Sequence, residues 1–150
     1  MTFPLRLPAA PLTLRAGQPA DAPALGRILW RARRQSDWTP HSFARGDCTE
    51  FCARMIARGW VTVAQMRKRP VGFLARDGAE VCALYVARLA RKRGIGAALI
   101  HEAQADQSEL WLQCWADNRA ARAFYAALGF AETDRTGDKL TLTWAMEAEK

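Results

Sequence analysis

The sequence predicts an α/β (α+β) fold in which helices pack on the faces of one mixed sheet. The expected elements follow one another as βααβββαβαββ, which gives seven strands and four helices. Hydrophobic periodicity changes from two residues to 3.6 after Val86, and Asp77-Gly78 is a strong signal for a tight hairpin. Because the 150-residue chain is half hydrophobic, it is long enough to bury one core, so a single domain is expected.

The first elements are expected to be a short strand and two helices. Residues Leu12–Arg15 alternate like a strand, and Gly17-Gln18-Pro19 interrupts the alternation before a helical pattern over Asp21–Arg34. The next segments are a polar loop over Gln35–Asp47 and a second helix over Cys48–Arg58, which Gly59 ends.

A run of three antiparallel strands is expected next. These strands are Trp60–Met66, Val71–Arg76 and Glu80–Val86. The basic segment Arg67–Pro70 forms the first turn, and Asp77-Gly78 forms the second.

The second half of the chain is expected to alternate between helices and strands. One helix follows a turn that contains Gly94, and another spans Asn118–Leu128 with Gly129 at its C-terminal end. The strands are Leu110–Cys114, Ala131–Asp134 and Leu140–Met146. The apolar faces expected for the two helices are Ile95, Ala98, Leu99 and Ala103 in the first, and Ala120, Ala123, Phe124 and Ala127 in the second.

Composition narrows the classes of protein to consider. No apolar stretch reaches the roughly 20 residues that cross a bilayer, and three prolines break Met1–Leu14, so neither a membrane span nor a signal peptide is expected. The four cysteines form no C-x-x-C pair, and neither His41 nor His101 lies at zinc-ligand spacing from them. We therefore expect reduced thiols, no metal and a cytoplasmic location.

The net charge of +7 favours a polyanionic ligand, which could be a nucleic acid or a phosphorylated cofactor. Part of the basic excess lies on the first helix. There Arg27, Arg31 and Arg34 recur opposite an apolar stripe, so they most simply solvate the helix. A nucleic-acid partner is therefore not expected, and the remaining basic cluster, Arg88–Arg93, is the more informative one.

The segment Arg91–Ala97 has the features of a phosphate site at the start of a helix. Gly94 and Gly96 let the backbone turn tightly and approach a ligand, and the unpaired first N–H groups of the helix favour an anion. A dinucleotide fingerprint would need a glycine where this chain has Leu99, and the G-K-[ST] of a P-loop is absent. Taken alone, the two glycines fit a tight strand-to-helix connection about as well as they fit a phosphate site.

Several segments together resemble the GCN5-related N-acetyltransferase (GNAT) family. The pyrophosphate loop of that family reads [QR]-x-x-G-x-[GA] after a strand, and Arg91–Gly96 matches it in register. The other matching segments are Glu80–Val86, Leu110–Leu112, Asn118, Ala120 or Ala121, Phe124-Tyr125 and Gly129-Phe130, which look like the fourth strand, the fifth strand and the helix that closes with G-F. The likeness spans roughly residues 12–144, so we expect an N-terminal extension over 1–11 and a single GNAT domain over 12–150.

The resemblance implies a mostly antiparallel sheet whose fourth and fifth strands splay apart around the pantetheine arm of acetyl-CoA. Leu84, Tyr85 and Val86 would lie along this arm, and a backbone N–H near Val86 would polarise the thioester carbonyl. Asn118 would contact the cofactor from the start of its helix, a role compatible with an ordinary helix cap. The residues expected around the pyrophosphate are Arg91, Lys92, Arg93, Gly94, Ile95, Gly96 and Ala97.

The resemblance also implies an N-acetyltransferase that moves acetyl to a primary amine by direct attack in a ternary complex. Tyr125, one position past Phe124 on its helix, would face the cofactor as the general acid for the departing thiolate, while Phe124 packs inside. Glu80 matches an acidic position that many family members use to deprotonate the amine. Some members instead carry a glutamate five residues before the asparagine, but this chain has Gln113 there, which cannot act as a base.

The acceptor site and two other functions stay open. Trp30, Trp38 and Trp115 are candidates for an aromatic wall that binds the amine, although core packing explains Trp30 better. A CoA-binding regulatory module without turnover is one alternative, because the base is uncertain. A basic nucleic-acid-binding protein is the other. Members of the family often dimerise, so the resemblance allows a homodimer.

Overall fold

The computed structural model describes residues 11–34, 45–91 and 93–146. Its α-helices are α1 (Ala22–Arg34), α2 (Arg45–Ala57), α3 (Ile95–Asp106) and α4 (Arg119–Ala127), and its 3₁₀ helices are η1 (Pro19–Asp21) and η2 (Arg88–Ala90). Its strands are β1 (Thr13–Ala16), β2 (Val61–Met66), β3 (Arg69–Asp77), β4 (Glu80–Val86), β5 (Glu109–Trp115), β6 (Ala131–Thr136) and β7 (Lys139–Ala145). The expected strands and α-helices are therefore all confirmed, whereas the two 3₁₀ helices were not predicted.

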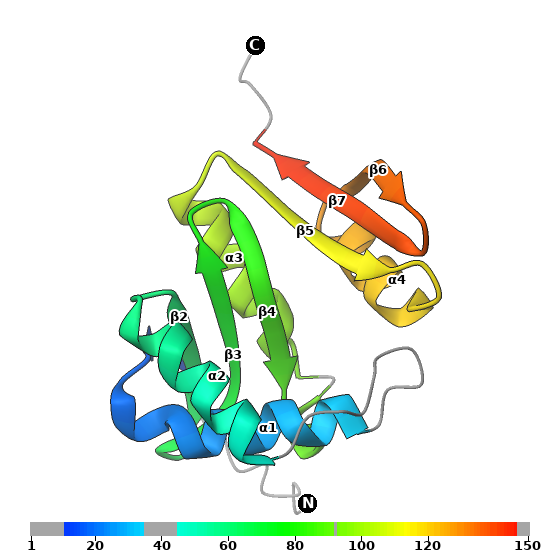
Figure 1. Cartoon of the computed structure of the whole chain (residues 1–150). Coiled ribbons are helices and arrows are strands. Elements are labelled where there is room, and N and C mark those ends of the chain that lie inside the picture. Colours follow the sequence, from blue (N-terminus) through cyan, green and yellow to red (C-terminus); the bar gives the residue numbers. More distant parts are fainter. Residues whose placement is uncertain (1–10, 35–44, 92, 147–150) are drawn as a thin grey trace, which may run out of the picture.

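The seven strands form one mixed sheet in the order β1-β2-β3-β4-β5-β7-β6. Only the central pair β4–β5 is parallel, and every other neighbouring pair is antiparallel. This arrangement confirms the mixed, mostly antiparallel sheet expected from the sequence. In Figure 1, β4 and β5 lie close together at one end and diverge toward the other.

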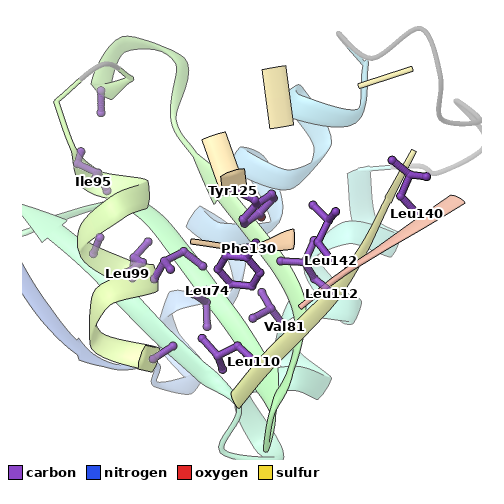
Figure 2. Packing of buried hydrophobic residues seen from close by; sticks show 14 residues of the cluster. Leu74, Val81, Ile95, Leu99, Leu110, Leu112, Tyr125, Phe130, Leu140 and Leu142 are labelled. Atoms are coloured by element: carbon purple, nitrogen blue, oxygen red, sulfur yellow. The ribbon is translucent and has the colours of Figure 1, made fainter. Parts of the chain in front are cut away.

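Two apolar clusters cover the two faces of the sheet. The helices α1 and α2 pack on one face, where Leu25, Leu29 and Phe73 are fully buried. The helices α3 and α4 cover the other face, where Leu74, Leu99 and other aliphatic side chains surround the paired rings of Tyr125 and Phe130 (Figure 2). Within the described ranges, no helix combines the length and the apolar character that a membrane span requires.

A buried ion pair fixes the start of α1 to the end of β1. Asp21 is only 8% exposed, and its two carboxylate oxygens accept hydrogen bonds of 2.8 Å from the Arg15 guanidinium. The backbone N–H of Gln18 donates to the same carboxylate at 2.7 Å, which closes the first turn of η1. The hydrogen bonds from Arg15 lower the pKa of Asp21, so this carboxylate stays ionised and holds α1 at a fixed angle to the sheet.

A β-bulge in β4 changes which side chains face each layer. Ala75 of β3 pairs with Ala83, and its neighbour Arg76 pairs with Val81, so Cys82 has no partner on β3. Strict alternation would place Val81 and Ala83 on the same face of the sheet. With the extra residue they lie in opposite clusters, Val81 with α3 and Ala83 with α1.

The face that α4 buries differs from the predicted one. The prediction placed Phe124 inside together with Ala120, Ala123 and Ala127, but all three alanines are exposed. Tyr125 is the most buried residue of the helix, and Ala121 and Leu128 lie partly buried near it. Burying an alanine methyl removes much less apolar area than burying an aromatic ring, so the helix turns its aromatic side toward the core.

Candidate active site

A cavity of about 840 Å³ lies where β4 and β5 separate. The parallel pair meets only at Glu80 and Trp111, with a 2.9 Å hydrogen bond from the Trp111 N–H to the Ala79 carbonyl. Beyond that point the edge of β4 that faces β5 has no strand partner, so its backbone groups can pair with an extended ligand. The lining residues are Ala32, Arg33, Val81–Val86, Ala90, Arg91, Gly94–Ala97, Leu112–Trp115, Asn118, Ala120, Ala121, Phe124 and Tyr125.

One end of the cavity is the N-terminus of α3. Gly94 is its N-cap residue and has a left-handed backbone, with φ at 76°, so the chain can turn sharply into the helix. The first helical hydrogen bond runs from the Ala98 N–H to the Gly94 carbonyl at 2.9 Å. The N–H groups of Ile95, Gly96 and Ala97 therefore precede the helical ladder at the cavity wall, where they can bind an anion.

Gly96 has a second role, which is to let α4 approach α3. A Cβ atom at this position would lie 3.1 Å from the ring of Phe124, closer than ordinary van der Waals contact. The aromatic side of α4 therefore closes the cavity against the first turn of α3, and the glycine makes this close contact possible.

The three basic residues of the expected phosphate-binding loop differ in their position relative to the cavity. Arg91 lines the cavity, and its Nε donates a long hydrogen bond of 3.4 Å to the Val86 carbonyl. Arg93 is exposed and lies outside the described wall, and Lys92 is not among the described residues. The helix η2 separates β4 from this loop, so the connection is longer than the direct strand-to-helix turn that was predicted.

Asn118 combines the two roles considered for it. It is the N-cap residue of α4, and its side-chain oxygen accepts a hydrogen bond from the Ala121 N–H at 3.1 Å. It also lines the cavity. The helix cap is thus observed, and the position of Asn118 in the cavity wall allows contact with a ligand.

Tyr125 lies at the boundary between the core and the cavity. It is 9% exposed, and its ring packs edge-on against Phe130, with centroids 5.4 Å apart (Figure 2). The ring of Phe124 packs edge-on against it from within α4, at 5.0 Å. Burial raises the pKa of the Tyr125 phenol, and the nearby Cys114 and Tyr85 raise that pKa further. The hydroxyl therefore keeps its proton throughout the neutral range, as a hydrogen-bond or proton donor must.

Tyr85 and Arg33 form the side of the cavity toward α1. The Tyr85 ring packs 5.9 Å from Phe73, and burial raises the pKa of its phenol. The positive charge of Arg33 opposes this shift, and both side chains line the cavity. Arg33 comes from the last turn of α1 and is half-buried.

Glu80 does not line the cavity. It is half-buried at the start of β4, opposite Asp77 on β3 and Trp111 on β5, one residue before the wall begins at Val81. Contact between Glu80 and a ligand in the cavity would therefore need a bridging water.

The predicted acceptor residues are placed apart from one another. Trp115 lines the cavity, and Lys139 lies over its ring at 5.0 Å from the centroid. Trp30 lies outside the wall, packs against the cluster under α1, and carries Arg34 over its ring at 4.9 Å. Trp38 lies outside the described residues.

Sequence reasoning missed several lining residues, of which Arg33 is the most informative. It lies four positions after Leu29 and eight after Leu25, both fully buried, so helical spacing places it toward the core. That spacing is a usable signal, and it separates Arg33 from the exposed arginines of the same helix. Cys82 was missed because its position depends on a bulge, which no pattern in the sequence indicates.

The comparisons with known proteins agree with this geometry. The peptidyl-lysine N-acetyltransferase YiaC of Escherichia coli (strain K12) is 28% identical over 141 residues, which covers 89% of this chain and 94% of that protein. The chain also has the fold of the PaiA N-acetyltransferase of Thermoplasma acidophilum, solved with coenzyme A, at a TM-score of 0.69 and 16% identity over 90% of this chain and 99% of that one. The structure of yncA from Salmonella typhimurium, which contains acetyl-CoA, gives a TM-score of 0.71 and 17% identity over 94% of this chain and 97% of that one.

A family model supplies the assignment. The model of the acetyltransferase (GNAT) domain matches residues 57–132, about half of the chain. The matched range runs from β2 into β6 and contains the separating strands, the glycine loop and Tyr125. Apart from α1, the elements that build the cavity lie within the range that the family model matches. The chain belongs to the GNAT acetyltransferase family.

Proposed function

We propose that the protein transfers an acetyl group from acetyl-CoA to a primary amine, by direct attack of the amine in a ternary complex. The observation that carries this proposal is the cavity between β4 and β5, which is lined both by the first residues of α3 and by Tyr125. YiaC is named as a peptidyl-lysine N-acetyltransferase, and the structures of PaiA and yncA contain coenzyme A and acetyl-CoA. These names support an N-acetyltransferase.

The described residues fit acetyl-CoA as the co-substrate. Ligand cavities commonly measure roughly 300–1,000 Å³, and this one measures about 840 Å³. The N–H groups of Ile95–Ala97, with Arg91 beside them, suit the diphosphate. The open edge of β4 from Leu84 to Val86 suits the amide groups of the pantetheine arm. Asn118 and Tyr125 would complete the binding site from α4.

The chemistry of the transfer sets three demands on the chain. The amine must be unprotonated, the thioester carbonyl must be polarised, and the departing thiolate needs a hydrogen-bond or proton donor. A backbone N–H near Val86, on the open edge of β4, would polarise the carbonyl. Tyr125 would serve the thiolate, because its phenol is protonated and lines the same cavity.

Two routes are compatible with the described residues for removal of the amine proton. Glu80 would act through a water molecule, because it lies one residue outside the wall. Of the described lining residues, none is an aspartate or glutamate, which favours loss of the amine proton to solvent as the alternative. The same observation motivates the second candidate function, a CoA-binding regulatory module without turnover.

The test is the release of free CoA from acetyl-CoA across a panel of amines, with wild type and Tyr125→Phe. We expect the variant to keep the Kd for acetyl-CoA and to lose roughly 100-fold in kcat, the lower end of what a general acid contributes. Because the pKa of Tyr125 is raised, its proton stays bound to higher pH, so kcat of the wild type should not fall on the alkaline side up to about pH 10.

The control is Ala123→Ser, at an exposed position of α4 that does not line the cavity. It should behave as wild type. Full turnover by Tyr125→Phe would remove the proposed acid. Binding of acetyl-CoA by the wild type without CoA release for any amine would favour the regulatory module.

A further inference from the structure

The described charged residues of the cavity wall all carry a positive charge. Two of its described lining residues are charged, and both are arginines, Arg33 and Arg91. Arg91 belongs to the loop at the N-terminus of α3, where the diphosphate is expected. Arg33 reaches the cavity from α1, which packs on the face of the sheet opposite to α3. The diphosphate expected at α3 is therefore not the group that Arg33 would bind.

A second polar group of the wall lies on the side of α1. Tyr85 lines the same cavity and packs against the cluster under α1, the helix that carries Arg33. The charge of Arg33 also counteracts the effect of burial on the pKa of the Tyr85 phenol. The bulge at Cys82 sets this pairing, because it directs Ala83 and Tyr85 toward α1. The Arg15–Asp21 ion pair fixes the helix that carries Arg33.

We infer that the amine acceptor carries a carboxylate, and that Arg33 and Tyr85 bind this carboxylate. The inference rests on the proposed function, since it names the acceptor of the same site. The acceptor class is a small amino acid or a similar amino-carboxylate. A lysine side chain on a basic peptide does not fit this class.

The chemistry of both side chains suits a carboxylate. A guanidinium presents several N–H donors in a planar fork that matches the two oxygens of a carboxylate, and a phenol adds one O–H donor. A cationic wall without a described carboxylate disfavours an acceptor that brings a further positive charge. Tyr85 and Tyr125 line the same cavity, which suits an acceptor whose carboxylate and reacting amine belong to one small molecule.

The experiment compares acceptors that differ only in this charge. Glycine, L-alanine and β-alanine are assayed against glycinamide, L-alaninamide and β-alaninamide by CoA release, with each rate corrected for the measured fraction of unprotonated amine. We expect kcat/KM to favour the carboxylates by about tenfold or more, as a charged hydrogen bond would give. Arg33→Gln should remove most of this preference through a higher KM for the carboxylates, while KM for acetyl-CoA and turnover of the amides change much less.

Three further variants separate the role of Arg33 from an effect on folding. Arg31→Gln removes an exposed charge from the same helix outside the wall and should match wild type. Arg33→Lys, which keeps the charge without the fork, should retain part of the preference, and Tyr85→Phe should lose part of it. Circular dichroism and the Kd for acetyl-CoA show whether each variant is folded.

The possible outcomes distinguish this inference from the proposed function. Equal use of carboxylates and amides by the wild type, or equal losses for both series in Arg33→Gln, would overturn the inference and leave acetyl transfer in place. If no acceptor in either series releases CoA but another amine of the wider panel does, the inference is overturned and acetyl transfer stands. If no amine of the wider panel releases CoA, the proposed function is contradicted, and the inference with it.

Discussion

Tyr125 serves both the hydrophobic core and the cavity. Its ring packs between Phe124 and Phe130, and its burial raises the pKa of the phenol. Transfer of that proton to a thiolate, whose conjugate acid has an ordinary pKa of about 8.5, is therefore uphill. The phenol acts first as a hydrogen-bond donor that stabilises the developing thiolate, and the packing of two neighbouring rings keeps its position fixed.

A second residue-scale prediction concerns Glu80. If Glu80 accepts the amine proton through water, Glu80→Gln lowers kcat/KM most at a pH where the acceptor is protonated. At high pH, where the acceptor is already unprotonated, the variant should approach the wild-type rate. The measurement is the pH dependence of kcat/KM for one acceptor, with Glu109→Gln as the control, because Glu109 is an exposed residue outside the wall.

The results for Glu80→Gln separate the two routes for the proton. Parallel profiles for the variant and the wild type, at equal height, would show that Glu80 is not the base. The proton then passes to solvent, as a wall without a described carboxylate allows.

At the scale of elements, the bulge in β4 lets one strand direct side chains into both apolar clusters and still keep an open edge for a ligand. Past Cys82, Leu84 and Val86 pack in the cluster with α3, and Tyr85 packs in the cluster with α1. The strand therefore presents different side chains to the two sides of the cavity while its open edge stays free for an extended ligand. Bulges frequently re-aim side chains beside active sites, and this one does so for Tyr85.

The N-terminus of α3 carries the element-scale prediction. Gly94→Asp and Gly94→Asn introduce side chains of nearly the same shape, both of which tolerate a left-handed backbone and cap helices well. A Cβ at Gly94 meets no atom within 4 Å, so both should fold. The aspartate places a negative charge where the diphosphate is expected and should weaken acetyl-CoA binding by roughly tenfold or more, whereas the asparagine should bind nearly as wild type does.

Calorimetry at low and high salt measures this difference. Screening should reduce the gap between the two variants at high salt. Equal affinities for Gly94→Asp and Gly94→Asn at low salt would mean that no phosphate lies at the start of α3.

At the scale of the whole molecule, the sheet is continuous but its two parts diverge. The parts β1–β4 and β5–β7 meet through the Glu80–Trp111 pair and through the apolar cluster under α3 and α4. The cavity fills the space that opens between them, and its wall takes residues from β4, β5, α1, α3 and α4. A ligand in this cavity would bridge the two parts, so binding and stability should be coupled.

Much of this architecture could be predicted from the sequence, because strand and helix periods and turn residues are local signals. The hairpin at Asp77-Gly78, the N-cap at Asn118 and the glycine at the start of α3 were all identified in this way. What the sequence could not indicate depends on tertiary packing. The burial of the aromatic side of α4 follows from competition among side chains for the core, and the direction of Tyr85 toward α1 follows from the bulge at Cys82.

The most direct test of the central claim is a crystal structure of the protein in complex with CoA. We predict the diphosphate on the N–H groups of Ile95–Ala97, the pantetheine arm along β4, and the sulfur within hydrogen-bonding reach of the Tyr125 hydroxyl. A CoA molecule bound outside the gap between β4 and β5, or a Tyr125 hydroxyl directed away from the sulfur, would contradict it.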